Sequence, residues 1–220
     1  MHESTMHDMF LEQFVVGPFD VNCYLIGCPH HRKMAVIDPG GEVERIWRRV
    51  QETGYSLEYI INTHGHVDHI AGNLDLKHIS HAKILAHADD VLLMTTRQDM
   101  LYTMFPGAKP SPAPDQLLSD GQIIQLGNIN LQVLHTPGHT QGGICLFTDG
   151  VLFTGDTLFA EGIGRTDFPG GNYQQLIYSI RNKLFCLDAG LKILPGHGDE
   201  STLDREKRYN PFVGSAALDR

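Results

Sequence analysis

Four side chains that commonly bind metal ions lie within six consecutive residues, directly after the apolar run of residues 59–61. They are His64, His66, Asp68 and His69. In an extended chain alternate side chains point to the same side, so His64 and His66 would converge while the other two serve a neighbouring point. Imidazole and carboxylate ligands suit zinc or another first-row divalent ion. The spacing therefore predicts that one short loop holds much of a metal site, and an inert, solvated histidine cluster is the weaker interpretation.

Three further donors follow apolar runs in the second half of the chain. His139, Asp156 and His197 each stand next to glycine, which lets the backbone turn sharply and lets ligands crowd one point. Seven donors exceed the four that one tetrahedral ion uses, which indicates two ions that share a ligand. Asp156 is the preferred bridge, because a carboxylate has two oxygens. His135, four residues before His139, is interpreted as a structural residue or as support for a ligand.

The composition is that of a soluble globular protein. The 220 residues fit one domain, and the net charge of −9 argues against a nucleic-acid or membrane partner. No stretch approaches the roughly 18 apolar residues that span a membrane, and residues 1–8 do not resemble a signal peptide. The cysteine spacing fits no disulfide framework, so buried free thiols and a cytoplasmic location are expected, with a Cys23–Cys28 bond as the less favoured alternative. The cysteines are Cys23, Cys28, Cys145 and Cys186.

Short strands alternate with helical stretches on both sides of the chain's midpoint, and these elements must position the donors. Hydrophobic spacing predicts strands over residues 10–16, 22–27, 34–37, 58–62, 83–86, 122–126, 129–134, 144–147, 151–154 and 191–194. It predicts helices over residues 42–52, 73–78, 89–96, 172–184 and 203–209. This order suits two sheets with helices packed outside them.

Residues 97–119 break this pattern, because they hold several prolines and show no clear period. Irregular loops of this length often act as lids or binding elements. The apolar side chains between Met100 and Phe105 would form either an apolar flap or a local core, and the sequence leaves both possibilities open.

The order of the seven donors resembles the metallo-β-lactamase superfamily. The match runs through His64-x-His66-x-Asp68-His69, then His139, Asp156 and His197. Within that superfamily the chain looks most similar to the glyoxalase II group, the hydroxyacylglutathione hydrolases, and to their short bacterial relatives. The supporting segments are residues 63–69, 135–140, 155–159, 164–171 and 210–212. The resemblance covers nearly the whole chain and implies an α/β fold, a four-layer αββα sandwich with the metals at one edge of the two sheets.

The resemblance also implies how the donors divide between two ions. Metal 1 would be held by His64, His66 and His139, and metal 2 by Asp68, His69 and His197. Asp156 and a water-derived hydroxide would bridge the two ions, and Asp68 would also orient the hydroxide. Zinc is the expected metal, although iron and manganese accept the same ligand set.

These implications predict a hydrolase that cleaves a thioester such as an S-2-hydroxyacylglutathione by attack of a metal-bridging hydroxide. The metals would make hydroxide available at neutral pH and stabilise the oxyanion. The chain has no G-x-S-x-G nucleophile motif, which agrees with a mechanism that needs no serine. The expected partner is a small-molecule thioester, with a glutathione conjugate as the leading form, and the oligomeric state is left open.

Arg165 is the one substrate-binding candidate with a positional argument. It stands where glyoxalase II has a lysine that holds a glutathione carboxylate, and it keeps the positive charge. An ion pair with Asp167 is the alternative role, and Asp167 replaces a tyrosine of the family. Only residues 199–220 follow Gly198, so the family's C-terminal glutathione-binding helical region is predicted to be missing.

Three alternatives to thioester hydrolysis stay open. The first is a mononuclear iron persulfide dioxygenase of the same fold, in which His64, His139 and Asp156 would hold the iron. Residues 157–159 and 195–198 look more like the hydrolases and favour hydrolysis. The second is a hydrolase of lactones or other esters. The third is a non-catalytic scaffold with a fully closed metal site.

Overall fold

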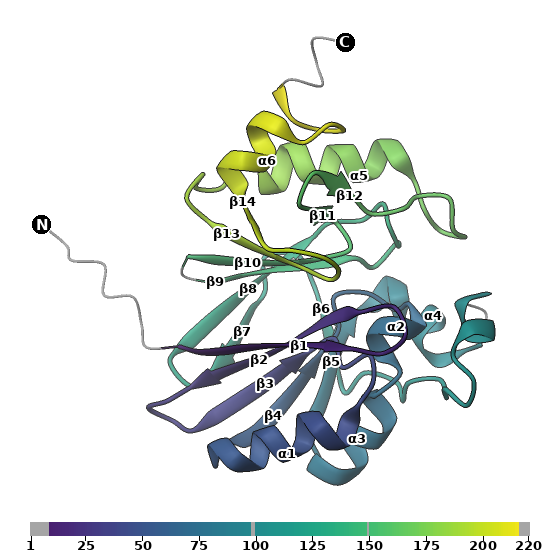
Figure 1. Ribbon diagram of the computed structural model, residues 1–220, viewed down its shortest axis with the longest axis vertical. Coiled ribbons are helices and arrows are strands. Elements are labelled where there is room, and N and C mark those ends of the chain that lie inside the picture. Colours follow the sequence, from purple (N-terminus) through teal and green to yellow (C-terminus); the bar gives the residue numbers. More distant parts are fainter. Residues whose placement is uncertain (1–8, 98–99, 149, 216–220) are drawn as a thin grey trace, which may run out of the picture.

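Two six-stranded sheets lie face to face, with helices on both outer faces (Figure 1). The computed structural model describes residues 9–97, 100–148 and 150–215. Helices α1 (Val43–Thr53) and α3 (Asn73–Ser80) cover one sheet, and α5 (Tyr173–Ser179) and α6 (Leu203–Tyr209) cover the other. The expected αββα sandwich is therefore confirmed.

The first sheet is mixed, in the order β1-β2-β3-β4-β5-β6. Its first three strands pair antiparallel and its last four pair parallel. The strands are β1 (Phe10–Val16), β2 (Val21–Cys28), β3 (Lys33–Ile37), β4 (Ser56–Ile61), β5 (Lys83–His87) and β6 (Gln116–Leu118).

The second sheet has the order β14-β13-β10-β9-β8-β7, and only its β10–β13 pair is parallel. Its strands are β7 (Ile123–Leu126), β8 (Ile129–His135), β9 (Ile144–Thr148), β10 (Val151–Gly155), β13 (Lys192–Pro195) and β14 (Ser201–Thr202). A small hairpin of β11 (Leu158–Phe159) and β12 (Gly162–Ile163) lies outside both sheets.

The central strands are buried on both faces, as the middle layers of four must be. In β3, Met34 and Val36 pack toward the helices, whereas Ala35 and Ile37 pack toward the second sheet. This period of two follows from the alternation of side chains along a strand. A third apolar cluster packs α5 against the second sheet, with Leu176 among its buried residues.

One edge of the sandwich gathers the strand ends that carry the candidate donors. The sheets are joined there by hydrogen bonds from the Asn22 amide to the Gly196 carbonyl and from the Ile144 amide to the Thr63 carbonyl, each 2.8 Å long. Parallel pairing of β10 with β13 brings their carboxyl ends to the same edge. Residues far apart in the chain therefore meet there.

Several expectations need correction. The donor loop is not extended throughout, because residues Val67–Ile70 form a helical turn, α2, that begins after His66. The irregular stretch 97–119 contains a 3₁₀ turn, η2 (Met100–Met104), and ends in β6. The helix predicted over 172–184 continues beyond α5 as a π-helical turn, η3 (Ile180–Leu184). The helix predicted over 89–96 is a 3₁₀ turn, η1 (Ala88–Asp90), followed by α4 (Val91–Thr95).

The choice between flap and local core at 100–105 is decided mainly for a core. Tyr102 and Phe105 are buried against Val67, whereas Met104 is 56% exposed. Residues 98–99 lie outside the described residues. All four cysteines are free, as expected, but Cys186 is exposed rather than buried. Within the described residues, no helix has both the length and the apolar character needed to cross a membrane.

Candidate metal centre

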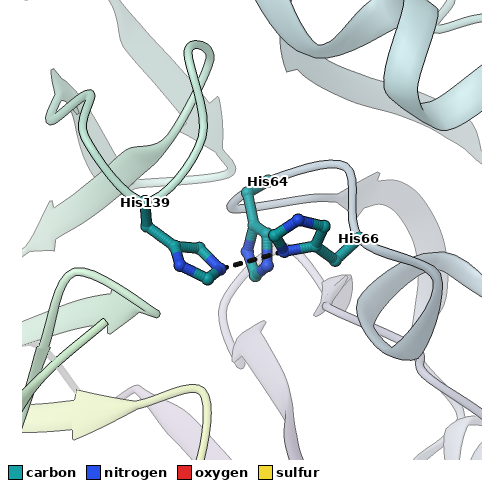
Figure 2. Close-up of side chains that lie close together, drawn as sticks. All are labelled: His64, His66 and His139. Carbon is teal, nitrogen blue, oxygen red and sulfur yellow. Dashed lines mark hydrogen bonds between the residues drawn. The ribbon is translucent and has the colours of Figure 1, made fainter. Parts of the chain in front are cut away.

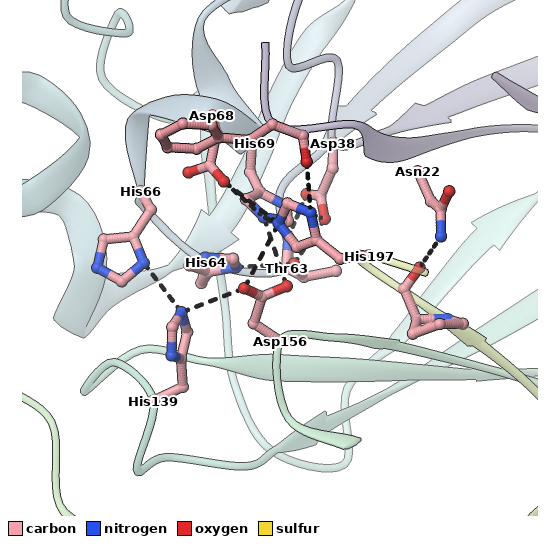
Figure 3. Close-up of polar contacts among 12 residues, drawn as sticks. Asn22, Asp38, Thr63, His64, His66, Asp68, His69, His139, Asp156 and His197 are labelled. Atoms are coloured by element: carbon pink, nitrogen blue, oxygen red, sulfur yellow. Dashed lines mark hydrogen bonds and ion pairs between the residues drawn. The ribbon is translucent and has the colours of Figure 1, made fainter. Parts of the chain in front are cut away.

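Seven donor side chains converge from five segments at this edge of the sandwich (Figure 3). The β4–α2 loop supplies His64 and His66, and the first helical turn after it supplies Asp68 and His69. The other three donors follow β8, β10 and β13, and they are His139, Asp156 and His197. The seven donors that were chosen from the sequence therefore lie close together in the structure.

The first group consists of three imidazoles, His64, His66 and His139, with one nitrogen of each within 4.8 Å of the others. Figure 2 shows these rings converging from two loops. The Nδ1 atom of His66 lies 2.9 Å from Nε2 of His139. All three side chains are buried.

The second group combines Asp68, His69 and His197, again within 4.8 Å. Nε2 of His197 lies 3.3 Å from Nε2 of His69 and 3.3 Å from Oδ2 of Asp68. Asp156 lies between the two groups, with Oδ2 3.5 Å from Nε2 of His139 and Oδ1 3.5 Å from Nε2 of His69. One carboxylate therefore reaches both groups.

Three buried donor atoms lack a hydrogen-bond partner among the residues that the structure describes. They are Nε2 of His64, Oδ1 of Asp68 and Oδ1 of Asp156. An unpaired buried polar atom costs about 1–3 kcal/mol, and more when it is charged. Bound cations would satisfy all three atoms, and the donor types are those that zinc and iron accept. The residues therefore fit a metal centre.

Acceptors in the protein hold the outer nitrogens of three rings. Nδ1 of His139 lies 2.7 Å from the Arg165 carbonyl oxygen, and Nδ1 of His197 lies 2.9 Å from the Phe19 carbonyl oxygen. A carbonyl only accepts, so these nitrogens donate and, in the neutral rings, each Nε2 carries a lone pair that points into the centre. Nδ1 of His69 lies 3.0 Å from Oδ2 of Asp38 in the same way. Metal-binding histidines are typically oriented by such partners.

Asp38 is a supporting residue that the sequence reasoning missed. Its carboxylate also accepts hydrogen bonds from the Thr63 amide at 2.8 Å and the Thr63 hydroxyl at 2.6 Å. It follows β3 and precedes Pro39-Gly40-Gly41, so its position at the end of a strand is the signal that could have identified it. A side chain at Gly40 would overlap the carbonyl oxygen of Asp68, so glycine lets these two loops approach closely.

Asp90 is a second supporting residue that the sequence reasoning missed. This buried carboxylate accepts from the Gly65 amide at 2.8 Å, the Thr140 hydroxyl at 2.8 Å and the Gly142 amide at 2.7 Å. It thereby ties the loop of His64 and His66 to the loop of His139. No local sequence signal marks this role, because all three partners are distant in the chain.

The pKa values of His64 and His66 in the first group are lowered, whereas that of His69 in the second group is raised. Burial, and next the neighbouring imidazoles, lower the pKa of His64 well below its ordinary value, and burial and the charge of His139 lower the pKa of His66 to about 3. Burial opposes the charged form of His69 too, but the carboxylates of Asp68, Asp156 and Asp38 outweigh it and raise the pKa of His69 to about 10.

The other members of the second group follow the same logic. Burial would lower the pKa of His197, but its hydrogen bond to Asp68 and the charge of Asp156 raise it. Burial would raise the pKa of Asp68, but the charge of His69 and the hydrogen bond from His197 hold that pKa below its ordinary range. The second group is therefore a set of mutually stabilised charges.

Arg165 makes the ion pair that was its alternative role. Its guanidinium lies 3.0 Å and 2.7 Å from the two carboxylate oxygens of Asp167. It also lies over the Phe168 ring, 4.2 Å from the centroid, and that ring lies 5.4 Å from the ring of His66. The Arg165 carbonyl supports His139, a role that the sequence did not indicate.

An open cavity of about 240 Å³ adjoins the first group at His66. Its walls include Leu93, Gln141 and Phe168, with Asp89 at the same surface. His135 belongs to neither donor group. Its ring stacks on His87 instead, with centroids 3.9 Å apart. The expectation that His135 is not a ligand of this centre agrees with that placement.

Comparisons with known proteins agree with the fold. Residues 16–197 match the family model described as the metallo-beta-lactamase superfamily. The chain is 39% identical over 211 residues to the hydroxyacylglutathione hydrolase GloC of Haemophilus influenzae, covering 94% of this chain and 99% of that protein.

Two solved structures are also similar. ETHE1 from Myxococcus xanthus has a TM-score of 0.78 at 29% identity, over 93% of this chain and 84% of that chain. TTHA1623, solved in a di-iron-bound form, has a TM-score of 0.84 at 30% identity, over 92% of this chain and all of that chain. On the extent of the family match and the identity to GloC, the chain belongs to the metallo-beta-lactamase superfamily.

Proposed function

We propose that this protein is a metal-dependent thioester hydrolase of the glyoxalase II type that works with two divalent ions. The observation that carries the proposal is the position of Asp156, whose two oxygens approach two separate groups of donors. The 39% identity to a hydroxyacylglutathione hydrolase supports the substrate class.

The proposed ligands follow the two groups. His64, His66 and His139 would hold one ion, Asp68, His69 and His197 the other, and Asp156 would bridge them. Zinc is the proposed metal, and a related structure in a di-iron-bound form shows that this fold also accepts iron. When bound, two such ions lower the pKa of a shared water and polarise a carbonyl group.

The protein's own residues would do the rest by positioning. The Arg165 and Phe19 carbonyls and the Asp38 carboxylate hold the rings in fixed orientations, which keeps the donors preorganised. Asp68 keeps its negative charge at neutral pH because of His69, so its carboxylate can accept a hydrogen bond from the attacking water. A thiolate leaves without a general acid, so none is required of the protein.

The cavity beside His66 is the proposed substrate site. Leu93 and Phe168 give it apolar walls that suit an acyl group. Arg165 would bind a carboxylate of the thiol portion by exchanging its partner Asp167 for the substrate. Both residues are about two-thirds exposed, so this exchange costs little, because ion pairs between exposed side chains contribute little to stability.

The test combines metal quantification with an activity panel of a thioester, a persulfide and a lactone. We expect about two ions per chain and thiol release from S-lactoylglutathione. His66→Ala and Asp156→Ala should lose metal and most turnover, whereas His78→Ala, an exposed histidine on α3, should keep both. Full metal content and full turnover in both site variants would contradict the proposal.

The same panel tests the persulfide dioxygenase alternative. That reading needs one iron and leaves Asp68, His69 and His197 without a metal role, although they form a complete donor group with an unpaired buried oxygen on Asp68. Oxygen uptake with glutathione persulfide, one iron per chain and no thioester cleavage would replace our assignment with this one.

A further inference from the structure

Two histidines outside the candidate metal centre lie face to face at the same edge of the sandwich. His87 ends β5 in one sheet, and His135 ends β8 in the other. Their ring centroids are 3.9 Å apart and their planes differ by 13°. Asp89 lies beside them, with Oδ2 3.7 Å from Nδ1 of His87. One donor atom of each residue lies within 4.8 Å of the others, so the three form a group. None of them is one of the seven donors of the candidate metal centre, so the group is separate from that centre.

The backbone selects the tautomer of His135. Its Nε2 atom lies 2.9 Å from the carbonyl oxygen of Gln141, and it must donate because a carbonyl only accepts. In the neutral ring, Nδ1 then keeps the lone pair that binds metal. This arrangement matches the way in which metal-binding histidines donate their second nitrogen to a fixed acceptor.

His87 and Asp89 supply complementary properties. The His87 side chain is only 11% exposed, and burial, followed by the charge of His135, lowers its pKa below the ordinary value. It therefore stays neutral at physiological pH and keeps one lone pair, on Nδ1, which accepts a hydrogen bond from the Asp89 amide at 3.3 Å. The Asp89 side chain is 55% exposed, which leaves the group open to an ion from solvent and supplies one negative charge.

We propose that His87, Asp89 and His135 form an accessory site for a divalent cation that prefers imidazole, of the zinc, nickel or copper type. The two stacked rings do not both face one point, so the His87 ring must rotate to face a shared ion, and this rotation also releases its Nδ1 from the Asp89 amide. The χ2 torsion of histidine is broad, which allows that rotation. Three protein donors leave the remaining coordination positions to water. Magnesium and calcium prefer oxygen ligands and do not suit this group.

An ion at this site would tie together elements that also support the main centre. Asp89 precedes Asp90, which holds Gly65 and the 140–142 loop, and Gln141 of that loop holds His135. Metal binding would therefore link β5, β8 and this loop. We expect it to raise the thermal unfolding temperature, in addition to the effect of ions in the main centre.

The test is equilibrium dialysis of the full chain against Zn²⁺, followed by metal quantification. We expect the His87→Gln/His135→Gln double variant to bind one ion fewer per chain than the wild type. The matched control is His30→Gln/His78→Gln, which removes two exposed histidines elsewhere and should bind as the wild type does. Zn²⁺ should also shift the ring-nitrogen resonances of His87 and His135. Equal ion counts in the wild type and the first variant, or unmoved ring resonances, would overturn the site.

A second variant guards against misfolding of the first. Asp89→Asn removes only a surface carboxylate and should weaken the binding of this ion by at least about tenfold, on the scale of lost metal partners. Unchanged affinity would contradict the site. The candidate metal centre is tested separately. Asp156→Ala should lose ions at that centre and still bind the ion at His87, Asp89 and His135. If this variant also lost the ion at His87, Asp89 and His135, the accessory site would not be independent.

Discussion

The two donor groups of the candidate centre share one edge and one carboxylate, but they differ in charge. The first consists of three buried imidazoles, two of which, His64 and His66, have lowered pKa values. The second pairs Asp68 with His69 and His197, whose pKa values are raised. His64 and His66 are therefore neutral and ready for an ion, whereas the second group holds protons where an ion would lie.

The buried aspartates that support the two groups also differ, since one contacts a ligand ring and the other holds loops. Asp38, a carboxylate, contacts His69 directly in the second group. The corresponding carboxylate near the first group, Asp90, accepts hydrogen bonds from the loops that carry the ligands, through Gly65, Thr140 and Gly142. Direct contact stabilises the charged form of a ring, whereas indirect support fixes only its position. The two sites thus differ in charge mainly because Asp68 belongs to the second group, and the contact of Asp38 with His69 adds to that difference.

The largest expected effect comes from removing one ligand of each group. His139→Ala should lose the ion of the first group and His197→Ala that of the second, and each should lower kcat/KM by more than about a hundredfold, beyond the effect of losing an outer partner. Metal quantification and thioester hydrolysis measure both outcomes. If either variant kept two ions and wild-type turnover, its side chain would not be a ligand.

Asp38→Asn should selectively weaken the second group. The amide still fills the space, but it cannot stabilise a positive His69 or accept all three hydrogen bonds. We expect about a 10- to 100-fold loss in affinity for the second ion, with little change for the first. Competition with a chelator measures both affinities, and Asp75→Asn on the surface of α3 is the matched control. An equal loss at both ions would show that Asp38 does not distinguish the groups.

The sequence identified the donors because they obey a local rule. Each of the seven follows an apolar strand-like run or lies in the His64–His69 cluster, and glycine stands beside the later ones. The layers of sheets and helices could also be predicted from the sequence, since alternation along β3 and helical spacing in α1 are local patterns. Local rules therefore account for two sheets with helices outside them and for the set of donors, whereas the αββα sandwich and the division into two groups were implied by the family resemblance.

Asp90, the turn α2 and the role of the Arg165 carbonyl could not be predicted from the sequence in this way. Asp90 acts on residues 25 to 52 positions away, and only the packed structure brings them together. The helical turn α2 was missed because four residues are too few to show a period, and the packing of Val67 against Tyr102 and Phe105 accompanies it. The ion pair of Arg165 with Asp167 was foreseen, but the use of the Arg165 carbonyl was not, because backbone acceptors carry no residue signature.

Asp90→Asn should weaken the support of the first group, with a smaller effect than Asp38→Asn has on the second group. Both carboxylate oxygens accept hydrogen bonds, so an amide nitrogen there must face at least one backbone donor. An unpaired buried donor costs about 1–3 kcal/mol, and we expect the free energy of unfolding to fall by about that amount. Denaturant unfolding with and without metal measures this change. Retained stability together with unchanged affinity for the first ion would remove Asp90 from its supporting role.

The smallest expected effect is in proton release, and it has a definite sign. In the metal-free protein at pH 7, His69 carries a proton because its pKa is about 10, whereas His64 and His66 are neutral. Binding of the second ion should therefore release about one proton from His69, and binding of the first should release fewer, because His64 and His66 have none to lose. Affinity for the second ion should accordingly fall more steeply as the pH is lowered from 8 to 6. Calorimetric titration in buffers of different ionisation enthalpy measures the release, and equal release for both ions would show that the two groups do not differ in protonation.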